Sequence, residues 1–425
     1  MSVASRPSAA QRLPYWEFVT IVASLMALNA AAIDILIPAL QQIGATLGVA
    51  TENERQLAIS SYVLGFGAAQ IVYGPLSDRF GRRPILFVGL AIYTAASIGA
   101  AFSPTFGTLL FFRAVQGIGA AATRVLAVSI VRDCFGGARM ASVMSLIMMV
   151  FMTIPVIAPN IGVAIMTFGS WQEIFILNGL FAALVTLWAY LRLPETLHPE
   201  DRRDLTPRRT IEAFRIVLTN RRTLGYSVAT AFILGGLFGF INQAEQIYTQ
   251  VFGIGPLFTL YFSASALFMA AASLTNSRLV ERLGMRRLSH GALCIFVVLS
   301  ALQFLVTLVF GTPPFGVFLV LTILSFGMFG FIFTNFNALA LDPLGHVAGT
   351  ASSVLGCVQT LGGGLLGALI GHFYDGSVTP LFGGFLVLSL GALLCVVWAE
   401  GGRLFARPGE SHDHMAEAEA QAPAE

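Results

Sequence analysis

Lysine is missing from this chain: all 24 residues in the combined count of lysine and arginine are arginine. Without lysine there is no Walker-type P-loop, because the lysine of that loop reaches the phosphates of ATP. The same absence excludes a chromophore held as a Schiff base, since that bond needs a lysine amine. The chain therefore carries neither an ATP motor of its own nor a retinal-type pigment.

Charge is scarce as well. Only 11% of the 425 residues are charged and 56% are hydrophobic, whereas a water-soluble domain carries roughly 25% charged residues. This composition excludes a soluble enzyme and predicts a protein embedded in a lipid bilayer. The formal charge of +2 is too small to indicate a nucleic-acid partner. The 4 cysteines show no metal-binding or redox spacing, so we expect no disulfide framework, no metal and no other cofactor.

A ten-residue turn occurs twice in the chain, at Gly74–Arg83 and at Ser277–Arg286. The copies share an acid, an arginine, a glycine and a second arginine at matching places: Asp78 and Glu281, Arg79 and Arg282, Gly81 and Gly284, Arg83 and Arg286. Each copy forms a short basic loop between two long apolar runs. A repeat of this kind in an apolar chain predicts two related membrane halves around a central cavity, the architecture of many secondary transporters.

Apolar runs of about 20 residues, the length that spans a bilayer, recur along both halves. The first half contains Trp16–Leu40, Gln56–Leu76, Pro84–Phe102, Thr108–Val131, Ala141–Thr167 and Trp171–Leu191. The second contains Thr223–Val251, Leu257–Asn276, Leu288–Phe310, Phe315–Leu339, Gly349–Phe373 and Pro380–Val397. We predict an all-α integral membrane protein with twelve transmembrane helices in two pseudo-symmetric six-helix bundles, over residues 1–192 and 223–400. A linker over 193–222 and a disordered tail over 401–425 complete the chain.

Arginine is concentrated in alternate loops. The arginine-rich loops and the central linker include Arg79, Arg82, Arg83, Arg132, Arg139, Arg202, Arg203, Arg208, Arg209, Arg282, Arg286 and Arg287. The loops on the opposite side contain Arg55 alone. Because arginine-rich loops stay in the cytoplasm, this asymmetry predicts a multi-pass protein whose termini and central linker are all cytoplasmic.

Polar side chains inside the predicted spans are costly, and they recur on every third helix. The first, fourth, seventh and tenth runs contain Asn29, Asp34, Arg113, Gln116, Arg124, Asn242, Gln243, Glu245, Asn335 and Asn337. The centres of the third, sixth, ninth and twelfth runs are nearly free of strongly polar groups. This pattern predicts four inner helices around a substrate cavity and four outer helices that face lipid. Arg124 lies nearer the cytoplasmic face than the other polar residues. An alternative to a place in the cavity is that its side chain extends to the lipid phosphates on that side.

Counting residues from the helix ends gives the depth of the charged groups. At a rise of about 1.5 Å per residue, Asp34, Arg113 and Glu245 lie within one turn of the same depth. Asp34 and Arg113 are therefore candidates for proton coupling, as a pair or as competitors for a proton and a substrate. A purely structural buried ion pair is the alternative, and Glu245 is alternatively a solvated acid at the outer headgroups. Because Asp34 is the only acid central to an inner helix of the first half, we expect it to carry the transported proton.

Three motifs resemble those of the major facilitator superfamily. The turn Gly74–Arg83, G-P-L-S-D-R-F-G-R-R, resembles motif A. Leu109–Ala121, L-L-F-F-R-A-V-Q-G-I-G-A-A, resembles motif B, with Arg113 as the motif arginine. Ile154–Gly162, I-P-V-I-A-P-N-I-G, resembles the antiporter motif C, although Ala158 stands where that motif has a glycine.

Shorter segments look like the Bcr/CflA drug-resistance branch of that superfamily. They are A-I-D-I-L-I-P-A-L at Ala32–Leu40, V-R-D at Val131–Asp133 and L-P-E-T-L at Leu193–Leu197. The resemblance implies the major facilitator fold and a proton-coupled antiporter in the bacterial inner membrane. Such a protein exports small drug-like or amphiphilic compounds by alternating access, and we expect it to act as a monomer and not as an enzyme.

The resemblance also implies roles for individual residues. It implies a cytoplasmic gate that stabilises the outward-open state, formed by Gly74, Asp78, Arg82 and Asp133. It implies a coupling element formed by the motif C residues Pro155, Pro159 and Gly162. The alternatives are that the arginines of motif A serve only topology and lipid contact, and that the prolines only kink their helix.

Two other function classes stay open. One is a proton-coupled transporter of a small metabolite, such as an organic acid or an amino-acid-like solute, on the same fold. A second arginine deep in the cavity would favour it, and Arg124 is the only candidate. The other class is a receptor or an intramembrane enzyme, which is disfavoured because the sequence places no metal-binding cluster or Ser-His pair at one depth.

Overall fold

The structure is a computed structural model that describes residues 13–405 apart from 50, 52, 136, 203–210, 212–214, 216–217 and 345–347. The described residues are helical, without a strand. The first half contains α1 (Tyr15–Asp34), α2 (Leu40–Thr46), α3 (Leu57–Phe80), α4 (Arg82–Ala101), α5 (Phe106–Cys134), α6 (Gly137–Phe168) and α7 (Trp171–Arg192). The second contains α9 (Arg221–Gln246), α10 (Phe258–Leu283), α11 (Met285–Phe310), α12 (Phe315–Leu341), α13 (Ala348–His372) and α14 (Thr379–Ala399). The predicted tail from residue 406 onward, and much of the predicted linker, lie outside the described residues.

Twelve helical segments of this structure are long and apolar enough to cross a membrane. The first is Tyr15–Thr46, in which α1 continues into α2, and the seventh is Arg221–Val251, in which α9 ends in a π-helical turn. The prediction of twelve spans is therefore confirmed, with helix ends a few residues beyond the apolar runs. The helices extend further than the runs because their last turns carry polar residues at the membrane surface.

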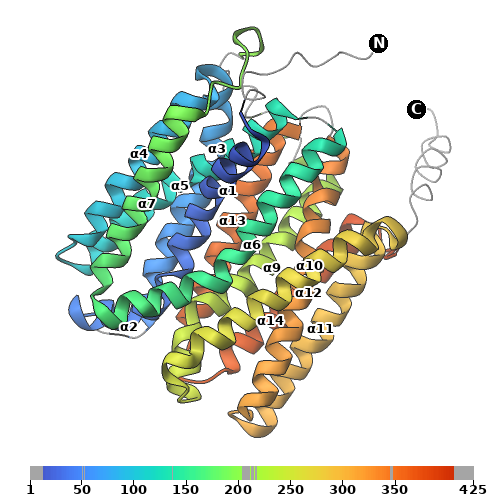
Figure 1. Ribbon diagram of the computed structural model, residues 1–425. Coiled ribbons are helices and arrows are strands. Elements are labelled where there is room, and N and C mark those ends of the chain that lie inside the picture. Colours follow the sequence, from blue (N-terminus) through green and yellow to red (C-terminus); the bar gives the residue numbers. More distant parts are fainter. Residues whose placement is uncertain are drawn as a thin grey trace, which may run out of the picture.

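The two halves repeat one packing pattern (Figure 1). In the first half α3 packs on α5, α5 on α4, and α4 on α7, while α1 contacts α5, α6 and α7. In the second half α10 packs on α12, α12 on α11, and α11 on α14, while α9 contacts α12, α13 and α14. The halves meet where α3 packs against α13 and α6 against α10, two contacts that a pseudo-two-fold axis exchanges. The arrangement is that of two related six-helix bundles, as the sequence repeat predicts.

The repeated turn has a backbone reason. Gly81 ends α3 and precedes α4 with φ 97° and ψ 157°. Gly284 ends α10 and precedes α11 with φ 80° and ψ 151°. A side chain at either φ would be strained, so glycine is the residue that lets two long helices reverse direction there. We call the end of the bundle that carries these two turns the arginine-rich end, and the opposite end, where α3 begins and α13 ends, the far end.

The outer helices present apolar rows to their surroundings. On α7, Leu177, Leu180, Leu184, Leu187 and Leu191 are all exposed. On α11, the exposed row is Ile295, Val298, Leu302, Leu305 and Val309. Spacings of three and four residues put each row on one helix face. A continuous apolar stripe of this length is stable against lipid and not against water, in keeping with the expectation that the sixth and ninth spans face the bilayer.

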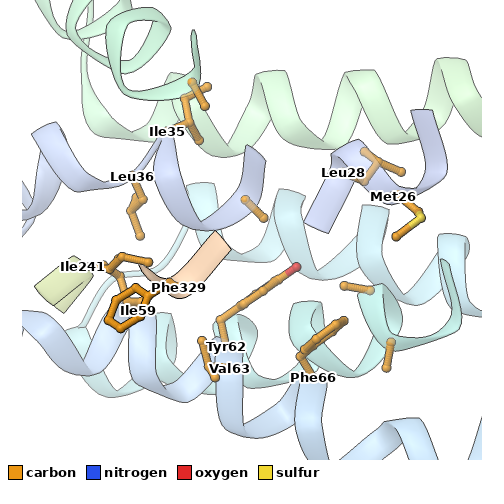
Figure 2. Close-up of a cluster of buried hydrophobic side chains, with 14 of the residues drawn as sticks. Met26, Leu28, Ile35, Leu36, Ile59, Tyr62, Val63, Phe66, Ile241 and Phe329 are labelled. Atoms are coloured by element: carbon orange, nitrogen blue, oxygen red, sulfur yellow. The ribbon is translucent and has the colours of Figure 1, made fainter. Parts of the chain in front are cut away.

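Close contact between α3 and α5 depends on glycine. A Cβ on Gly117 would lie 2.1 Å from the carbonyl oxygen of Tyr62, and one on Gly119 would lie 2.5 Å from the backbone nitrogen of Tyr93 on α4. The rings of Tyr62 and Phe66 stack 6.3 Å apart in the buried cluster between α1 and α3 (Figure 2). Small residues at these positions allow three helices to approach closely, which drives helix association where no hydrophobic effect operates.

We expect Gly117→Ala to destabilise the protein, because the new methyl group meets a backbone carbonyl that cannot turn aside. Overpacking of this kind costs about 1–3 kcal/mol, which should appear as a lower melting temperature in detergent. Gly107→Ala in the first turn of α5 is the matched control, since a Cβ there meets no atom within 4 Å. Equal melting temperatures for the two variants would contradict the packing argument.

Candidate functional site

Arg113 of α5 is fully buried and held by neutral groups. Its Nε donates to the carbonyl oxygen of Ala58 at 2.8 Å, and its Nη1 donates to Oε1 of Gln116 at 2.6 Å. Gln116 in turn donates to the hydroxyl of Ser97 at 2.7 Å. The guanidinium carbon lies 4.5 Å from the centroid of the Tyr62 ring. The aromatic face and the carbonyl dipole therefore stabilise a cation that has no carboxylate partner among the described residues.

Asp34 is the last residue of α1 and is 4% exposed. In the described part of the chain it forms no hydrogen bond and no ion pair through its side chain, with Arg113 or any other residue. Tyr62, whose ring lies under Arg113, also contacts α1, because its hydroxyl donates to Oδ1 of Asn29, five residues before Asp34, at 2.9 Å. The pairing that equal depth suggested is not formed in this conformation. Asp34 is instead a buried acid without a counter-ion, the type of intramembrane group that marks proton pathways.

Three of the predicted polar residues of the second half make hydrogen bonds within that half. Asn335 of α12 pairs with Asn276 of α10 at 2.7 Å, inside the second bundle. Gln243 donates to the carbonyl oxygen of Ile370 at 3.0 Å, also within that bundle. Glu245 is 4% exposed and accepts a hydrogen bond from the Thr249 hydroxyl at 3.2 Å.

The far end is closed by hydrogen bonds between the two halves. Asn242 donates to the hydroxyl of Ser60 at 3.3 Å, and Gln56 donates to Gln246 at 2.6 Å. Asn53 donates to the carbonyl oxygens of His372 and Tyr374 at the end of α13. The sequence analysis predicted Asn242 as a cavity residue and missed Asn53, Gln56 and Gln246. Gln56 begins a predicted span and is polar, a signal that could have identified it.

A cavity lies between α3, α5, α12 and α13, towards the arginine-rich end. Its polar lining residues are Gln70, Arg124, Ser129, Arg132, Asn337, Ser352, Ser353 and Gln359. Of the predicted cavity residues only Asn337 is among its lining residues, whereas Asn29, Gln116, Asn242, Gln243, Glu245 and Asn335 are not. Gln70 and Gln359 were missed because they lie on the second and eleventh spans, outside the every-third-helix pattern. A glutamine inside an apolar run is itself unusual, and this could have identified both as cavity residues.

The predicted gate residues form a charged cluster at the arginine-rich end. Arg82 is 3% exposed and contacts Asp78 through Nη1 and Asp133 through Nε, the latter at 2.8 Å. Its Nη1 also donates to the hydroxyl of Ser77 at 2.7 Å. These contacts tie together the ends of α3, α4 and α5. Gly74 lies one turn away from the cluster, where a Cβ would come 2.6 Å from the Ser353 hydroxyl of α13.

Glu195 completes this cluster and was not predicted to do so. Its carboxylate accepts hydrogen bonds from the backbone N–H groups of Arg82 and Arg83 at 2.9 and 3.1 Å. A carboxylate at a helix N-terminus is stabilised by the helix dipole, here that of α4. The second half keeps only part of this arrangement: Arg286 contacts Glu400 at 3.0 Å, and Met285 stands where the first half has Arg82.

The motif C residues lie on α6, which runs through both Pro155 and Pro159. Gly162 lies against the carbonyl of Ile35 and the ring of Pro38, so α6 contacts the segment just after Asp34. Between the two prolines, the carbonyl oxygen of Val156 accepts a hydrogen bond from Ser263 of α10 at 2.6 Å. The proline segment thus connects the acid-bearing end of α1 with the other half of the molecule.

Comparison with known proteins agrees with this architecture. A family model described as the Major Facilitator Superfamily matches residues 22–368. The bicyclomycin resistance protein homolog of Haemophilus influenzae is 30% identical over 89% of this chain and 93% of its own length. The multidrug resistance protein MdtL of Escherichia coli is 29% identical over 92% of this chain and 97% of its own. The uncharacterized MFS-type transporter YdgK of Bacillus subtilis is 29% identical over 86% of this chain and 90% of its own.

Solved structures share the fold at low sequence identity. The xylose transporter XylE of E. coli, in a partially occluded inward open conformation, aligns with a TM-score of 0.66 at 12% identity over 90% of this chain and 96% of its own. The human organic anion transporter MFSD10 (TETRAN) aligns with a TM-score of 0.62 at 20% identity over 91% and 97%. At these identities the likeness shows the fold alone. Together with the family match and the twelve spans, it confirms the resemblance drawn from the motifs: the chain belongs to the major facilitator superfamily and is a secondary transporter, not an enzyme.

Proposed function

We propose that this protein is a proton-coupled antiporter that exports small drug-like or amphiphilic compounds by alternating access. The observation that carries the proposal is Asp34, a buried acid that has no counter-ion among the described residues, beside the α6 segment that contains Pro155 and Pro159. An uncompensated carboxylate in a membrane interior is costly, and taking up a proton removes that cost. Two of the relatives are named for drug resistance, which supports an exporter.

The proposal assigns the arginine-rich end to the cytoplasm of a bacterial cell, with the inner membrane around the helices. The two bundles, residues 1–192 and 223–400, then rock about the α3–α13 and α6–α10 contacts. The conformation described above has hydrogen bonds between the halves at the far end and a polar cavity towards the arginine-rich end. Such a conformation takes up its substrate from the cytoplasm and releases it once the far-end hydrogen bonds break.

A second candidate is export or import of a small organic acid. The observation that favours it is Arg124, a cation that lines the cavity and pairs with no acid among the described residues. The two candidates share the fold, the coupling acid and the gate, and differ in the charge of the substrate.

Asp34→Asn should abolish transport driven by a pH gradient, because asparagine cannot take up and release the proton. The measurement is drug extrusion from everted vesicles or proteoliposomes, with counterflow exchange as the test that the variant is folded and still binds. Asp375→Asn removes an exposed acid at the far end and is the control. If the Asp34→Asn variant extrudes the drug as fast as the wild type under a pH gradient, Asp34 does not carry the coupled proton.

Asp78→Asn should weaken the charged cluster at Arg82 and make the arginine-rich end open more often. A cysteine introduced at Ser353, beside Gly74, should then react severalfold faster with a water-soluble maleimide. Glu281→Gln, at the matching position of the second half, is the control, because Met285 offers that acid no arginine at the place of Arg82. Equal labelling rates for both variants would indicate that the charges of motif A only set the membrane topology and do not hold the gate.

Arg113→Lys keeps the charge but replaces the planar fork by a point charge, so it cannot make both bonds to Ala58 and Gln116. Interhelical hydrogen bonds in membranes contribute about 0.6 kcal/mol on average and up to about 1.7. We expect a lower melting temperature together with a loss of transport of roughly tenfold, since the Tyr62–Asn29 contact beside Asp34 depends on this packing. Arg79→Lys, at an exposed position, should change neither. Wild-type transport by Arg113→Lys would show that the charge suffices.

A further inference from the structure

The cavity at the arginine-rich end is cationic. Among the residues that the structure describes, its lining includes two arginines, Arg124 and Arg132, and no aspartate or glutamate. Arg132 is exposed at the end of α5, whereas Arg124 lies two turns deeper on the same helix. A ligand that enters this space therefore meets positive charge at the mouth and again inside. In a partly dry cavity such charges act far more strongly than on a surface.

Arg124 has free hydrogen-bonding capacity. Its guanidinium carbon lies 5.8 Å from the centroid of the Phe66 ring, and no carboxylate, carbonyl or hydroxyl of the described chain accepts a hydrogen bond from it. This distinguishes it from Arg113 and Arg82, both of which donate to oxygen atoms within their bundle. An arginine presents donors in a fork that matches the two oxygens of a carboxylate or sulfonate.

Gln359 supplies a second, independent donor. Its side chain is 2% exposed, it lines the same cavity from α13, and its Nε2 finds no hydrogen-bond partner in the described part of the chain. A buried amide N–H without a partner costs free energy, which an acceptor on a bound ligand would recover. The neighbouring Gln70 is already engaged, since its Nε2 donates to Thr360 at 3.1 Å. The two free donors, Arg124 and Gln359, come from different halves of the molecule.

The lining also has an apolar part, to which Val125, Val128, Leu341 and Leu355 contribute beside the neutral polar residues Ser129, Asn337, Ser352 and Ser353. A ligand that satisfies all these surfaces has an anionic group at one end and a hydrophobic body. Hydrophobic walls with a few converging polar groups are the usual composition of a small-molecule site.

We propose that this cavity binds amphipathic organic acids, with the carboxylate or sulfonate held between Arg124 and Gln359. The inference rests on the proposed transport function, for which it names the substrate class. Because the two donors belong to opposite halves, a bound acid bridges the bundles at the arginine-rich end. Binding of the acid thereby favours the approach of the halves that closes this end.

The test is ligand binding by the purified protein in detergent, measured as a Kd by titration and as a rise in melting temperature. The probes are a graded series of aryl carboxylates, from benzoate to 1-naphthoate, each beside its uncharged amide. We expect the acids to bind about ten- to hundredfold more tightly than the amides, the range expected for a charge-assisted hydrogen bond. Arg124→Gln should remove this difference, and Arg124→Lys should keep part of it.

Arg278→Gln is the matched control, since this exposed arginine lies on α10 outside the cavity. Gln359→Leu should weaken binding of the acids severalfold and leave binding of the amides unchanged. Equal affinity for acids and amides, no binding of any acid in the series, or an acid preference that survives Arg124→Gln would each overturn the inference.

An anionic lipid headgroup carries the same chemistry, so titrations are repeated in nanodiscs of phosphatidylcholine with and without phosphatidylglycerol. A Kd for 1-naphthoate that is the same in both supports a small acid. A Kd that rises with phosphatidylglycerol in the wild type but not in Arg124→Gln would assign the site to lipid and overturn the small-acid assignment. Binding in detergent needs no pH gradient. If the wild-type protein binds the acids but shows no transport driven by a pH gradient, the proposed function is refuted and this inference still stands.

Discussion

The cost of burying polar groups away from water is the constraint on which this structure depends. Within each helix the backbone N–H and C=O groups bond to one another, so the remaining cost comes from buried polar side chains. Arg113 is the clearest case, because a fully buried cation is stabilised by the Ala58 carbonyl, the Gln116 amide and the face of Tyr62. Those contacts hold α3 and α5 at the close spacing that Gly117 permits. Asp34 and Arg124 lack such partners, and the proposals for a proton and for an organic acid follow from that difference.

The two bundles share a packing pattern but not a charge pattern. Both have a left-handed glycine at the repeated turn, and both attach the following helix to an acid, Glu195 in one half and Glu400 in the other. Only the first half has the Arg82 cluster, because Met285 occupies the matching place in the second. Three helix ends of the first half are therefore tied at the arginine-rich end by ion pairs. These ties suit a bundle that moves as one unit, which the proposed alternating access requires of each half.

The two ends of the molecule differ in the interactions of their polar groups. At the far end the halves meet through neutral amides and hydroxyls, such as Gln56 with Gln246 and Asn242 with Ser60. Water replaces such hydrogen bonds at little net cost, so the contact forms and breaks readily. At the arginine-rich end the charges are paired within one half, and the cavity between the halves contains unpaired donors. If the cavity binds an organic acid as proposed, the opening of this end depends on a bound anion, whereas the opening of the far end depends on hydration of its amides.

The sequence alone determined the twelve spans, the two related halves and the family, because these depend on apolar length and on local motifs such as Gly74–Arg83. It also singled out Asp34 and Arg113 as charges inside apolar runs, and Arg82 through the resemblance to motif A; the structure shows that all three are buried, and their roles are proposals. It did not determine which polar residues share a cavity. Asn335 pairs with Asn276 inside a bundle, Asn242 bridges the halves, and Arg124, Gln70 and Gln359 converge from three helices. Helix rotation and the choice of neighbouring helices decide this, and both are set by contacts between residues far apart in the chain, which only the tertiary structure contains.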